Sequence, residues 1–513
     1  MSKPQKKQGK VYLVGAGPGA IGLLTLRGAE ALREADVVIY DALVNRQILN
    51  FAPDTAELIF GGKRASHHAI PQERLNQMLV DLAGAGKTVI RLKGGDPYIF
   101  GRGGEEIAHL AKAKIDFEVV PGVSSFSAAP AYAGIPLTHR DHSSGFVVIT
   151  GYEDPDKPAP VVDWSAVANA PGTKVVFMGV KQMAHIADSL VAAGMSKKTP
   201  VAMVRWGTTG RQETIEGTLA TIAAAAGKAD FKPPAIIVIG EVVKMREQLS
   251  WFEKRPLLGQ RIVVTRARSQ AAELTSLLDG LGADVVELPM IRTEPPNDRD
   301  ALVDALTELN TYQWLVFTSA NGVDWFFHHF FKAFEDLRDI GGTRIAAVGP
   351  ATAAKLKALH LKVDVIPKKH TGAEVARAIN NFESIENLKI CLLRAAKATA
   401  DLPKELEAAG AIVDDIPVYE TVAETSDRLG AVAQFEESGA DWLTFTSAST
   451  VEHFHARFNL PQWVKKFPRA RVASIGPETT KALESLGIPP TIEAVDHTCA
   501  GLVTALQKAA RKK

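Results

Sequence analysis

The second half of this 513-residue chain repeats itself, and the repeat strongly limits the folds that it can adopt. The segment RIVVTRARSQAAELTSLLDGLGADVVELPMI from residue 261 recurs as KICLLRAAKATADLPKELEAAGAIVDDIPVY from 389. WLVFTSANGVDWF from 314 recurs as WLTFTSASTVEHF from 442, and RIAAVGPATAAKLKAL from 344 recurs as RVASIGPETTKALESL from 471. The offset of 127 or 128 residues is longer than a solenoid repeat of about 20–45 residues, so it predicts two similar α/β lobes that face each other.

Short apolar runs typical of strands alternate with helical stretches along the whole chain, which predicts the α/β class throughout. A polar, proline-bearing stretch without periodicity at residues 246–259 predicts a linker. We expect a flexible basic tail at 1–10, a first unit of two α/β subdomains at 11–245, divided near 120–145, and a second unit at 260–513. The lobes of the second unit are expected to comprise residues 260–290 with 420–508, and residues 292–418.

Composition excludes several classes of protein. A formal net charge of +1 argues against a nucleic-acid partner, which would call for a strong basic excess. No apolar run approaches the roughly 20 residues that span a bilayer, so we expect no membrane association and a cytoplasmic protein. The two cysteines, Cys391 and Cys499, are too few for a disulfide framework or a cysteine-based zinc site, and we interpret both as packing thiols with no metal site.

The N-terminal stretch VYLVGAGPGAIGLLTLRGAEAL, residues 11–32, resembles a dinucleotide-binding fingerprint. Gly15, Gly17 and Ala20 have the G-x-G-x-x-G/A spacing, and the next apolar run, DVVIY, ends before the acidic Asp41. A glycine-rich turn between strand and helix shows only that a ligand approaches the backbone closely near a helix N-terminus. An NAD-dependent oxidoreductase is therefore one alternative for the first half.

Two further glycine-rich stretches favour a different ligand. RLKGGDPYIFGRGGEE at 91–106 and VVPGVSSFSAAPAYAGIPLTHR at 119–140 hold more glycine and small hydroxyl residues than turns require. With VGAGPG, YDALV, GKRASHH, VFMGV and IIVIGEVV in the same order, they make residues 10–245 resemble the tetrapyrrole methylases, in particular the uroporphyrinogen-III C-methyltransferases. The resemblance implies a two-domain methylase fold that binds S-adenosylmethionine.

The resemblance also implies site residues for the first half. The cofactor contacts fall on Pro18, Gly94, Gly95, Asp96, Ile99, Ser124, Ser125, Met178 and Gly207. Asp41 and Lys63 match the proton acceptor and donor of the family, although either residue alone could be a solvated loop charge. Arg64, Arg102 and Arg140 suit the carboxylates of a tetrapyrrole substrate.

The second half resembles uroporphyrinogen-III synthases through FTSANGV, FTSASTV, VGPATA, IGPETT and PVYET. Hydroxyls and free amides at helix N-termini can bind carboxylates, although plain N-capping is the ordinary role of such residues. We expect substrate contacts from Ser319, Thr352, Arg394 and Ser447. The resemblance gives catalytic roles to Thr479 and Tyr419. Tyr419 stands where the first copy of the repeat has Ile291, and a half-buried core tyrosine is the alternative.

The two resemblances describe consecutive reactions. A synthase closes hydroxymethylbilane to uroporphyrinogen III with ring D inversion and loss of water, without a cofactor. A methyltransferase then adds two methyl groups from S-adenosylmethionine to give precorrin-2, on the branch to sirohaem and cobalamin. The family resemblance implies a homodimer through the methyltransferase half. The alternative is an NAD-dependent oxidoreductase joined to a non-catalytic, two-lobed tetrapyrrole-binding module.

Overall fold

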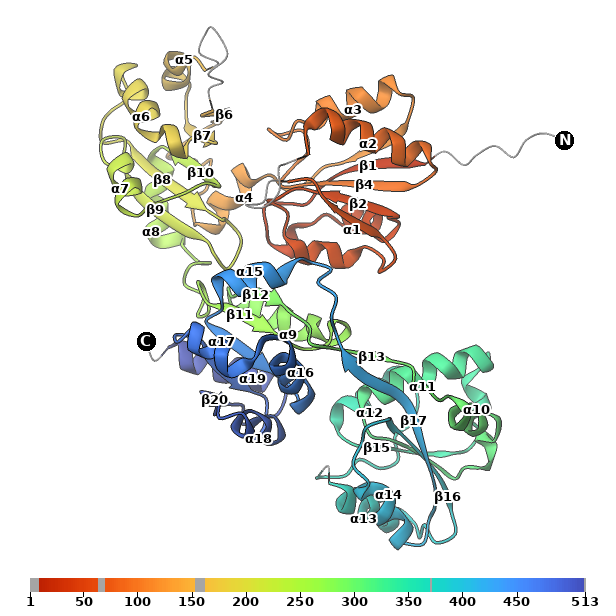
Figure 1. Ribbon diagram of the computed structural model, residues 1–513. Coiled ribbons are helices and arrows are strands. Elements are labelled where there is room, and N and C mark those ends of the chain that lie inside the picture. The colour runs from red at the N-terminus through yellow and green to blue at the C-terminus, as the bar shows by residue number, and fades with distance from the viewer. Residues whose placement is uncertain (1–8, 63–69, 153–161, 370, 512–513) are drawn as a thin grey trace, which may run out of the picture.

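The computed structural model describes residues 9–62, 70–152, 162–369 and 371–511, and these residues form four five-stranded sheets (Figure 1). Two sheets belong to the first half of the chain and two to the second, and helices flank each of them. Each sheet carries a cluster of buried apolar side chains on both faces. The α/β class predicted from the sequence is confirmed. None of the described helices is long and apolar enough to cross a membrane.

The first sheet is parallel, with the strand order β3-β2-β4-β1-β5. Its strands are β1 (Lys10–Gly15), β2 (Val37–Tyr40), β3 (Glu57–Phe60), β4 (Thr88–Lys93) and β5 (Asp116–Val120). The helices around it are α1 (Leu26–Arg33), α2 (Gln72–Gly84) and α3 (Gly103–Lys112), with the 3-10 helices η1 (Ile21–Leu23) and η2 (Arg46–Phe51). Strand β1 is central, with Val14 opposite Leu92 on one side and Val120 on the other.

The second sheet is mixed, with the order β6-β7-β10-β8-β9, and only the β6–β7 pair is parallel. Its strands are β6 (Phe146–Thr150), β7 (Thr173–Phe177), β8 (Pro200–Arg205), β9 (Glu213–Thr218) and β10 (Ala235–Ile239). The helices are α4 (Ser125–Tyr132), α5 (Trp164–Asn169), α6 (Met183–Ala192) and α7 (Ile222–Lys228), with η3 (Val180–Gln182) and η4 (Glu241–Met245). The chain passes from the first sheet to the second between the end of β5 and the start of β6.

The second half forms two five-stranded lobes, of which the first is all parallel and the second is parallel except for its antiparallel edge strand β13. The first lobe has the order β12-β11-β18-β19-β20, from β11 (Arg261–Val264), β12 (Asp284–Glu287), β18 (Trp442–Phe445), β19 (Arg471–Ser474) and β20 (Ile492–Glu493). The second lobe has β13-β17-β16-β14-β15, from β13 (Ile291–Glu294), β14 (Trp314–Phe317), β15 (Arg344–Ala347), β16 (Lys389–Ala395) and β17 (Ile412–Ala423).

The helices of the two lobes also correspond. The first lobe has α9 (Arg268–Gly280), α15 (Ala431–Ser438), α16 (Ala448–Phe458), α17 (Leu460–Lys466), α18 (Pro477–Ser485) and α19 (Cys499–Ala510). The second lobe has α10 (Asp300–Thr307), α11 (Ala320–Ala333), α12 (Pro350–Ala358), α13 (Gly372–Phe382) and α14 (Asp401–Ala408), with η5 (Leu309–Thr311) and η6 (Leu337–Ile340).

The two sequence repeats exchange elements to build these lobes. By the offset of the repeat, β11 corresponds to β16 and β14 to β18, yet β11 pairs with β18 and β14 pairs with β16. Each lobe therefore combines the opening strands of one copy with the later strands of the other. The long strand β17 leaves the second lobe as an antiparallel ribbon with β13, which leads back to the first lobe (Figure 1).

The segment 246–259, predicted as a linker, packs on its neighbours. It opens with the short helix α8 (Arg246–Leu249), and the side chains of Phe252 and Leu257 are buried. The backbone N–H of Gly259 donates to the carbonyl of Gly210 at 2.9 Å. The segment thus holds the second unit against the first.

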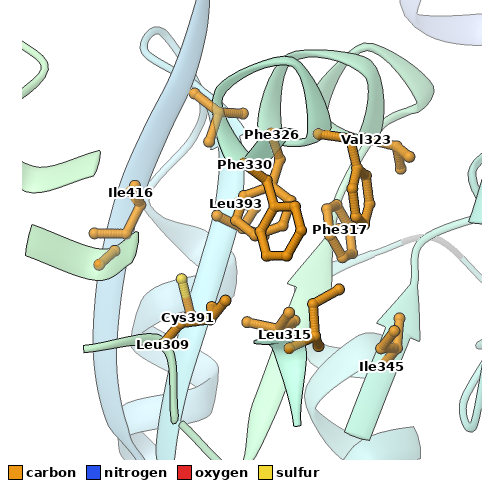
Figure 2. Close-up of a cluster of buried hydrophobic side chains, with 14 of the residues drawn as sticks. Leu309, Leu315, Phe317, Val323, Phe326, Phe330, Ile345, Cys391, Leu393 and Ile416 are labelled. Carbon is orange, nitrogen blue, oxygen red and sulfur yellow. The ribbon is translucent and has the colours of Figure 1, made fainter. Parts of the chain in front are cut away.

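The core of the second lobe shows why its elements form. Helix α11 turns Phe326 and Phe330 toward Phe317 of β14, while Cys391 of β16 lies in the same cluster (Figure 2). Burial raises the pKa of the Cys391 thiol, so this cysteine is a packing residue, as predicted.

We predict that Phe330→Ala destabilises the second lobe by about 3–5 kcal/mol, because it opens a cavity under α11. The neighbouring Phe331 is 47% exposed, so the control Phe331→Ala is expected to cost less than about 1 kcal/mol. Hydrogen exchange of the β14 and β16 amides at increasing denaturant concentration measures the loss of stability in both variants. Equal losses would contradict the assignment of Phe330 to the core.

Candidate active sites

Two glycine turns of the first unit meet at the carboxyl edge of its sheet. The turn after β1 and the loop after β4 exchange backbone hydrogen bonds, from Gly95 N–H to the Gly17 carbonyl at 2.8 Å and from Gly17 N–H to the Gly95 carbonyl at 3.2 Å. A Cβ on Gly15 would lie 2.6 Å from the backbone of Gly122. Only glycine permits this crossing, since real Cβ atoms do not approach a backbone so closely.

This geometry does not support the dinucleotide alternative. In a Rossmann sheet the first strand lies beside the second and the glycine turn opens a helix that receives the pyrophosphate. Here β1 lies between β4 and β5, and the glycine turn leads into the one-turn helix η1 before α1 begins at Leu26. Thr25 caps α1, and its hydroxyl accepts a hydrogen bond from Gly28 N–H at 3.1 Å.

A cavity of about 1260 Å³ opens at these turns, between the two sheets of the first unit. Seven of the predicted cofactor residues line it, namely Pro18, Gly94, Gly95, Ile99, Ser125, Met178 and Gly207. Four non-glycine residues of its wall have positive φ: Phe100, Met178, Trp206 and Thr208. Such strained backbone gathers at functional sites. A Cβ on Gly207 would lie 2.4 Å from the Cβ of Ala129, so glycine keeps this wall close to α4.

The other two predicted cofactor residues, Asp96 and Ser124, support the loops. The carboxylate of Asp96 accepts hydrogen bonds from Tyr98 N–H at 2.8 Å and from Gly122 N–H at 3.0 Å. Ser124 is buried at the N-terminus of α4. Asp96 thus ties the loop after β4 to the turn after β5.

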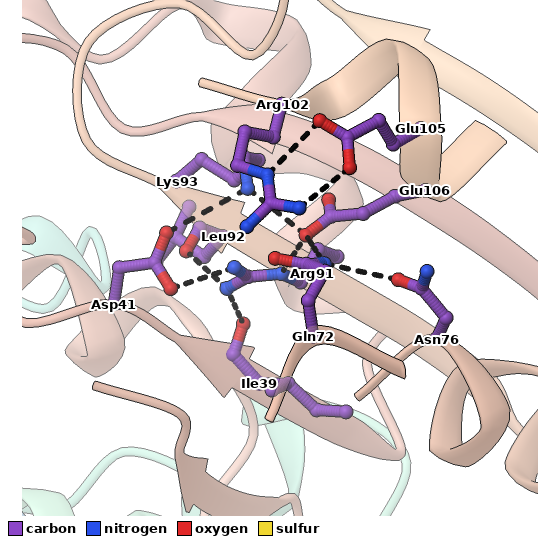
Figure 3. A network of polar contacts seen from close by, with 10 residues as sticks. All are labelled: Ile39, Asp41, Gln72, Asn76, Arg91, Leu92, Lys93, Arg102, Glu105 and Glu106. Atoms are coloured by element: carbon purple, nitrogen blue, oxygen red, sulfur yellow. Dashed lines mark hydrogen bonds and ion pairs between the residues drawn. The ribbon is translucent and has the colours of Figure 1, made fainter. Parts of the chain in front are cut away.

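Asp41, the predicted proton acceptor, lies in an ionic network at the same sheet edge (Figure 3). Arg91 Nη2 lies 2.6 Å and Lys93 Nζ 3.8 Å from its carboxylate oxygens. Both cations also contact Glu106 Oε1, at 3.1 and 3.0 Å, and Gln72 donates to the same oxygen. Glu106 is fully buried, so two cations bridge a buried carboxylate and the part-exposed Asp41.

Burial lowers the pKa of the Lys93 ammonium, and the charge of Arg91 lowers it further, while Glu106 and Asp41 act in the opposite sense. Arg91, Lys93 and Glu106 were not singled out from the sequence. The sequence did contain a signal for them, since Arg91 and Lys93 are two residues apart in the mainly apolar strand β4. Side chains two apart in a strand point to the same face, so a buried acidic partner could have been expected there.

Two of the three predicted substrate-binding arginines, Arg102 and Arg140, belong to the described residues. Arg102 adopts a left-handed conformation at the N-terminus of α3 and forms a two-point ion pair with the exposed Glu105, the shorter contact being 2.6 Å. Arg140 is exposed. Lys63 and Arg64 lie outside the described residues.

In the second unit, three of the predicted residues lie at the carboxyl ends of the two central strands of a sheet. Between these strands the order of the strands along the chain changes direction. Ser319 follows β14 and Arg394 ends β16, while Ser447 follows β18 next to β11. Open α/β sheets bind ligands at this point. Ser319 and Ser447 each cap the following helix, accepting from Gly322 N–H at 3.0 Å and Thr450 N–H at 3.3 Å.

Tyr419 lies beside Ser319. Its hydroxyl is 3.1 Å from Ser319 Oγ, and its ring belongs to the buried core of the second lobe. The hydroxyl of Thr352 on α12 donates to the carbonyl of Val348, which precedes the helix, at 3.1 Å. Thr479 is buried in α18 of the other lobe. The structure therefore brings Tyr419 and Ser319 together and places Thr479 on a different lobe.

Arg394 is engaged within its own lobe. Its guanidinium pairs with both oxygens of Asp415 and donates to the Thr399 carbonyl. Its repeat partner Arg266 contacts Cys499 Sγ at 2.8 Å. Between the lobes, the side-chain amide of Gln270 on α9 donates to Asn321 on α11. The helices that follow β11 and β14 thus meet. No group of three His, Cys, Asp or Glu residues among the described residues could hold a metal ion.

Known proteins match both halves. The family model for tetrapyrrole (corrin/porphyrin) methylases matches residues 10–223, and that for uroporphyrinogen-III synthase HemD matches 272–504. The porphyrin biosynthesis protein HemD of Ruminiclostridium josui is 40% identical over 452 residues, 88% of this chain and 89% of that protein. The uroporphyrinogen-III C-methyltransferase of Bacillus subtilis is 39% identical over 385 residues, 75% of this chain and 78% of that protein.

Among solved structures, the uroporphyrin-III C-methyl transferase of Thermus thermophilus complexed with S-adenyl homocysteine has 39% sequence identity and a TM-score of 0.40. The match covers 46% of this chain and 99% of that chain.

We predict that Glu106→Gln destabilises the first unit by about 3–5 kcal/mol, because it leaves two buried cations with one carboxylate between them. Glu105, its exposed neighbour, forms a surface ion pair, so Glu105→Gln is the matched control and is expected to cost about 1 kcal/mol or less. Calorimetric unfolding of the two variants tests this difference. A loss in Glu106→Gln no greater than in the control would mean that the network does not stabilise this sheet edge.

Proposed function

This chain belongs to the tetrapyrrole methylases through its first half and to the uroporphyrinogen-III synthases through its second, and from that premise we propose the following route. The second unit closes hydroxymethylbilane to uroporphyrinogen III, with inversion of ring D and loss of water. The first unit then transfers two methyl groups from S-adenosylmethionine to that product, giving precorrin-2. The observation that supports the second step is the glycine-walled cavity between the two sheets of the first unit.

The cavity suits S-adenosylmethionine. The crossing of Gly17 and Gly95 and the packing of Gly207 on Ala129 leave a backbone-walled space that larger side chains would fill. The sulfonium of the cofactor supplies a methyl group to a carbon nucleophile in line with the breaking C–S bond. The chain has to hold the two carbons within about 3–3.5 Å and keep water out, which needs rigid walls more than charged groups. Gly94, Gly95 and Ser125 form the near wall in this proposal.

Asp41 is proposed to accept the proton that the pyrrole system releases after methyl transfer. Its neighbour Ala42 lines the cavity, and the carboxylate is part-exposed at the same edge of the sheet. Arg91 and Lys93 hold this carboxylate in position and are proposed as positioning residues. Lys63, the proton donor that the family resemblance implies, lies outside the described residues.

We predict that Asp41→Asn slows formation of the methylated product by about 10²–10⁴-fold, the usual contribution of a general base, with little change in cofactor affinity. Gly95→Val should do the reverse and abolish cofactor binding, because Gly95 lines the cavity and its φ of +68° disfavours a side chain. Calorimetric titration with S-adenosylhomocysteine and single-turnover methylation separate the two effects. Equal loss of cofactor affinity in both variants would remove the distinction.

For the synthase step, the proposal gives the chain a task of positioning. Loss of the hydroxyl of hydroxymethylbilane as water leaves an electron-poor methylene carbon on the terminal pyrrole. That carbon must meet the substituted carbon of ring D rather than its free position. The hydroxyl pair of Tyr419 and Ser319, at the reversal point of the second lobe, can hold the departing oxygen or a ring N–H. In the first lobe, Ser447 is the repeat partner of Ser319 and Thr479 that of Thr352. Thr479 is proposed to contact the substrate from that lobe, and Thr352 and Arg394 are proposed to support the contact surface.

We predict that Tyr419→Phe slows formation of isomer III several-fold without abolishing it, because positioning is shared among many contacts. Ile291→Val, at the repeat partner of Tyr419, is the control and is expected to leave the rate unchanged. Since unassisted closure yields isomer I, the ratio of isomers III and I in the oxidised products reports the contribution of the enzyme. An unchanged isomer ratio and an unchanged rate in Tyr419→Phe would show that the Tyr419 hydroxyl has no role in the reaction and that the ring serves only core packing.

Two experiments test the function as a whole. Titration with S-adenosylmethionine and with NAD should show binding of the first compound alone. Incubation with hydroxymethylbilane in the absence of S-adenosylmethionine should give uroporphyrinogen III. Isomer I as the sole product would contradict the synthase assignment and favour a non-catalytic binding module.

The assembly and location of the enzyme are also part of the proposal. The resemblance of the first unit to dimeric methyltransferases supports a homodimer through that unit, which sedimentation of the full chain tests. We place the enzyme in the cytoplasm, and cell fractionation tests that location.

A further inference from the structure

The cavity of the first unit has a wall that comes from the second unit. Besides the glycine turns, its lining includes Thr275 and Asp279 of α9, residues 283–287 at and before β12, and Leu429 and Gln434 at α15. β12 is an edge strand of the first lobe, since it pairs with β11 alone. Figure 1 shows β12 and α15 directly beside the first unit. At about 1260 Å³, the cavity exceeds the roughly 300–1,000 Å³ of an ordinary single-ligand site.

Specific contacts hold this lobe against the cavity. Arg428 pairs with Asp54 and donates to the carbonyls of Pro53 at 2.6 Å and Ala52 at 3.3 Å. Leu429 is buried within the apolar core of the first sheet. A Cβ on Gly210 would lie 2.2 Å from the backbone of Ala283, so that turn follows the surface of the lobe closely. The docking is therefore built from buried and charge-assisted contacts.

Two continuous paths of contact run from the predicted cofactor residues to this lobe. In the first, Trp206, which precedes Gly207, stacks under Arg211 at 4.0 Å, and Arg211 lies 3.5 Å from Asp284.

In the second path, Tyr132 on α4 packs on Phe252 at 4.9 Å, and Phe252 lies under Arg255 at 4.8 Å. Arg255 in turn donates to the Asp279 carbonyl at 3.4 Å. The two paths connect the docked lobe with the cavity wall beside Gly207.

Asp279 is the one residue of this wall whose carboxylate accepts no hydrogen bond from any described residue. Its neighbours Glu287 and Asp284 are both engaged, Glu287 by Thr275 at 2.8 Å and Asp284 by Arg261 at 2.9 Å. Burial, together with the charges of Glu287 and Asp284, raises the pKa of Asp279 to about 7. A carboxylate kept without a partner in a cavity wall is costly unless a ligand supplies one.

We infer that the S-adenosylmethionine site of the first unit is composite: the α9–β12 edge of the synthase lobe closes it, and Asp279 accepts from the N–H or cationic groups of the bound cofactor. The inference rests on the proposed methyltransferase function. Its consequence is coupling, because a ligand that touches both units stabilises their docking, and by reciprocity the docked lobe strengthens binding of that ligand. The two units then form one ligand-binding site together, and do not act as independent halves joined by a linker.

The test is calorimetric titration of the full chain with S-adenosylhomocysteine at pH 8, where Asp279 is ionised. Arg428→Ala undocks the lobe at a site that does not line the cavity, and we expect it to weaken binding about tenfold, within the usual range of coupling. Arg338→Ala is the matched control, since Arg338 forms an exposed ion pair with Asp336 on the second lobe. Wild-type affinity in Arg428→Ala would overturn the inference.

A second variant, Asp279→Ala, tests the same inference if Arg428→Ala does not fold. This variant removes an unpartnered carboxylate from a helix, so it should be no less stable than the wild type, yet bind S-adenosylhomocysteine several-fold more weakly. Asp304→Ala on α10 is its control, an exposed helical aspartate of the second lobe. Unchanged affinity in Asp279→Ala would overturn the inference as well.

Hydrogen exchange gives a readout that needs no variant. Saturating S-adenosylhomocysteine should slow exchange of the backbone amides at residues 283–287, in the wall from the synthase lobe. No change there, with clear protection at Gly94 and Gly95, would show that the lobe takes no part in binding. If the wild type binds no S-adenosylhomocysteine at all, the proposed methyltransferase function fails, and that result is distinct from failure of the composite site.

Discussion

The crossing of two glycine turns, after β1 and after β4, is the contact on which the first unit depends. Backbone hydrogen bonds between Gly17 and Gly95 fix the floor of the cavity, and the missing side chains at Gly15 and Gly122 allow the loops after β1 and β5 to touch. Because the walls are backbone, the ligand meets amides and carbonyls at short range. That arrangement suits a reaction in which geometry, rather than a strong acid or base, limits the rate.

The second unit depends on an exchange of strands between its two repeats. Each lobe takes its opening strands from one copy and its later strands from the other, so each lobe is built from both copies. The exchange makes the two reversal points equivalent, with Ser319 in one lobe and Ser447 in the other. Tyr419 breaks the equivalence, and an asymmetric substrate requires such a difference.

Local patterns in the sequence predicted the features that depend on local structure. The alternation of apolar runs and helical stretches predicted the α/β class, and the repeat offset predicted two lobes. The resemblance to the methylases implied the seven residues of the cavity wall. Contacts between distant segments escaped prediction. Glu106 joins Arg91 and Lys93 only because α3 packs over β4, and Arg394 pairs with Asp415 across two strands. The wall from Asp279 depends on the docking of two units, which no local pattern encodes.

The account joins two consecutive reactions in one chain, and a single reaction mixture tests that claim most directly. Hydroxymethylbilane is supplied with S-adenosylmethionine carrying a labelled methyl carbon, and the tetrapyrrole product is identified by mass spectrometry. The account predicts precorrin-2 with two labelled methyl groups, formed without any added enzyme. An unlabelled tetrapyrrole, or methylation only when uroporphyrinogen III is added from outside, would contradict it.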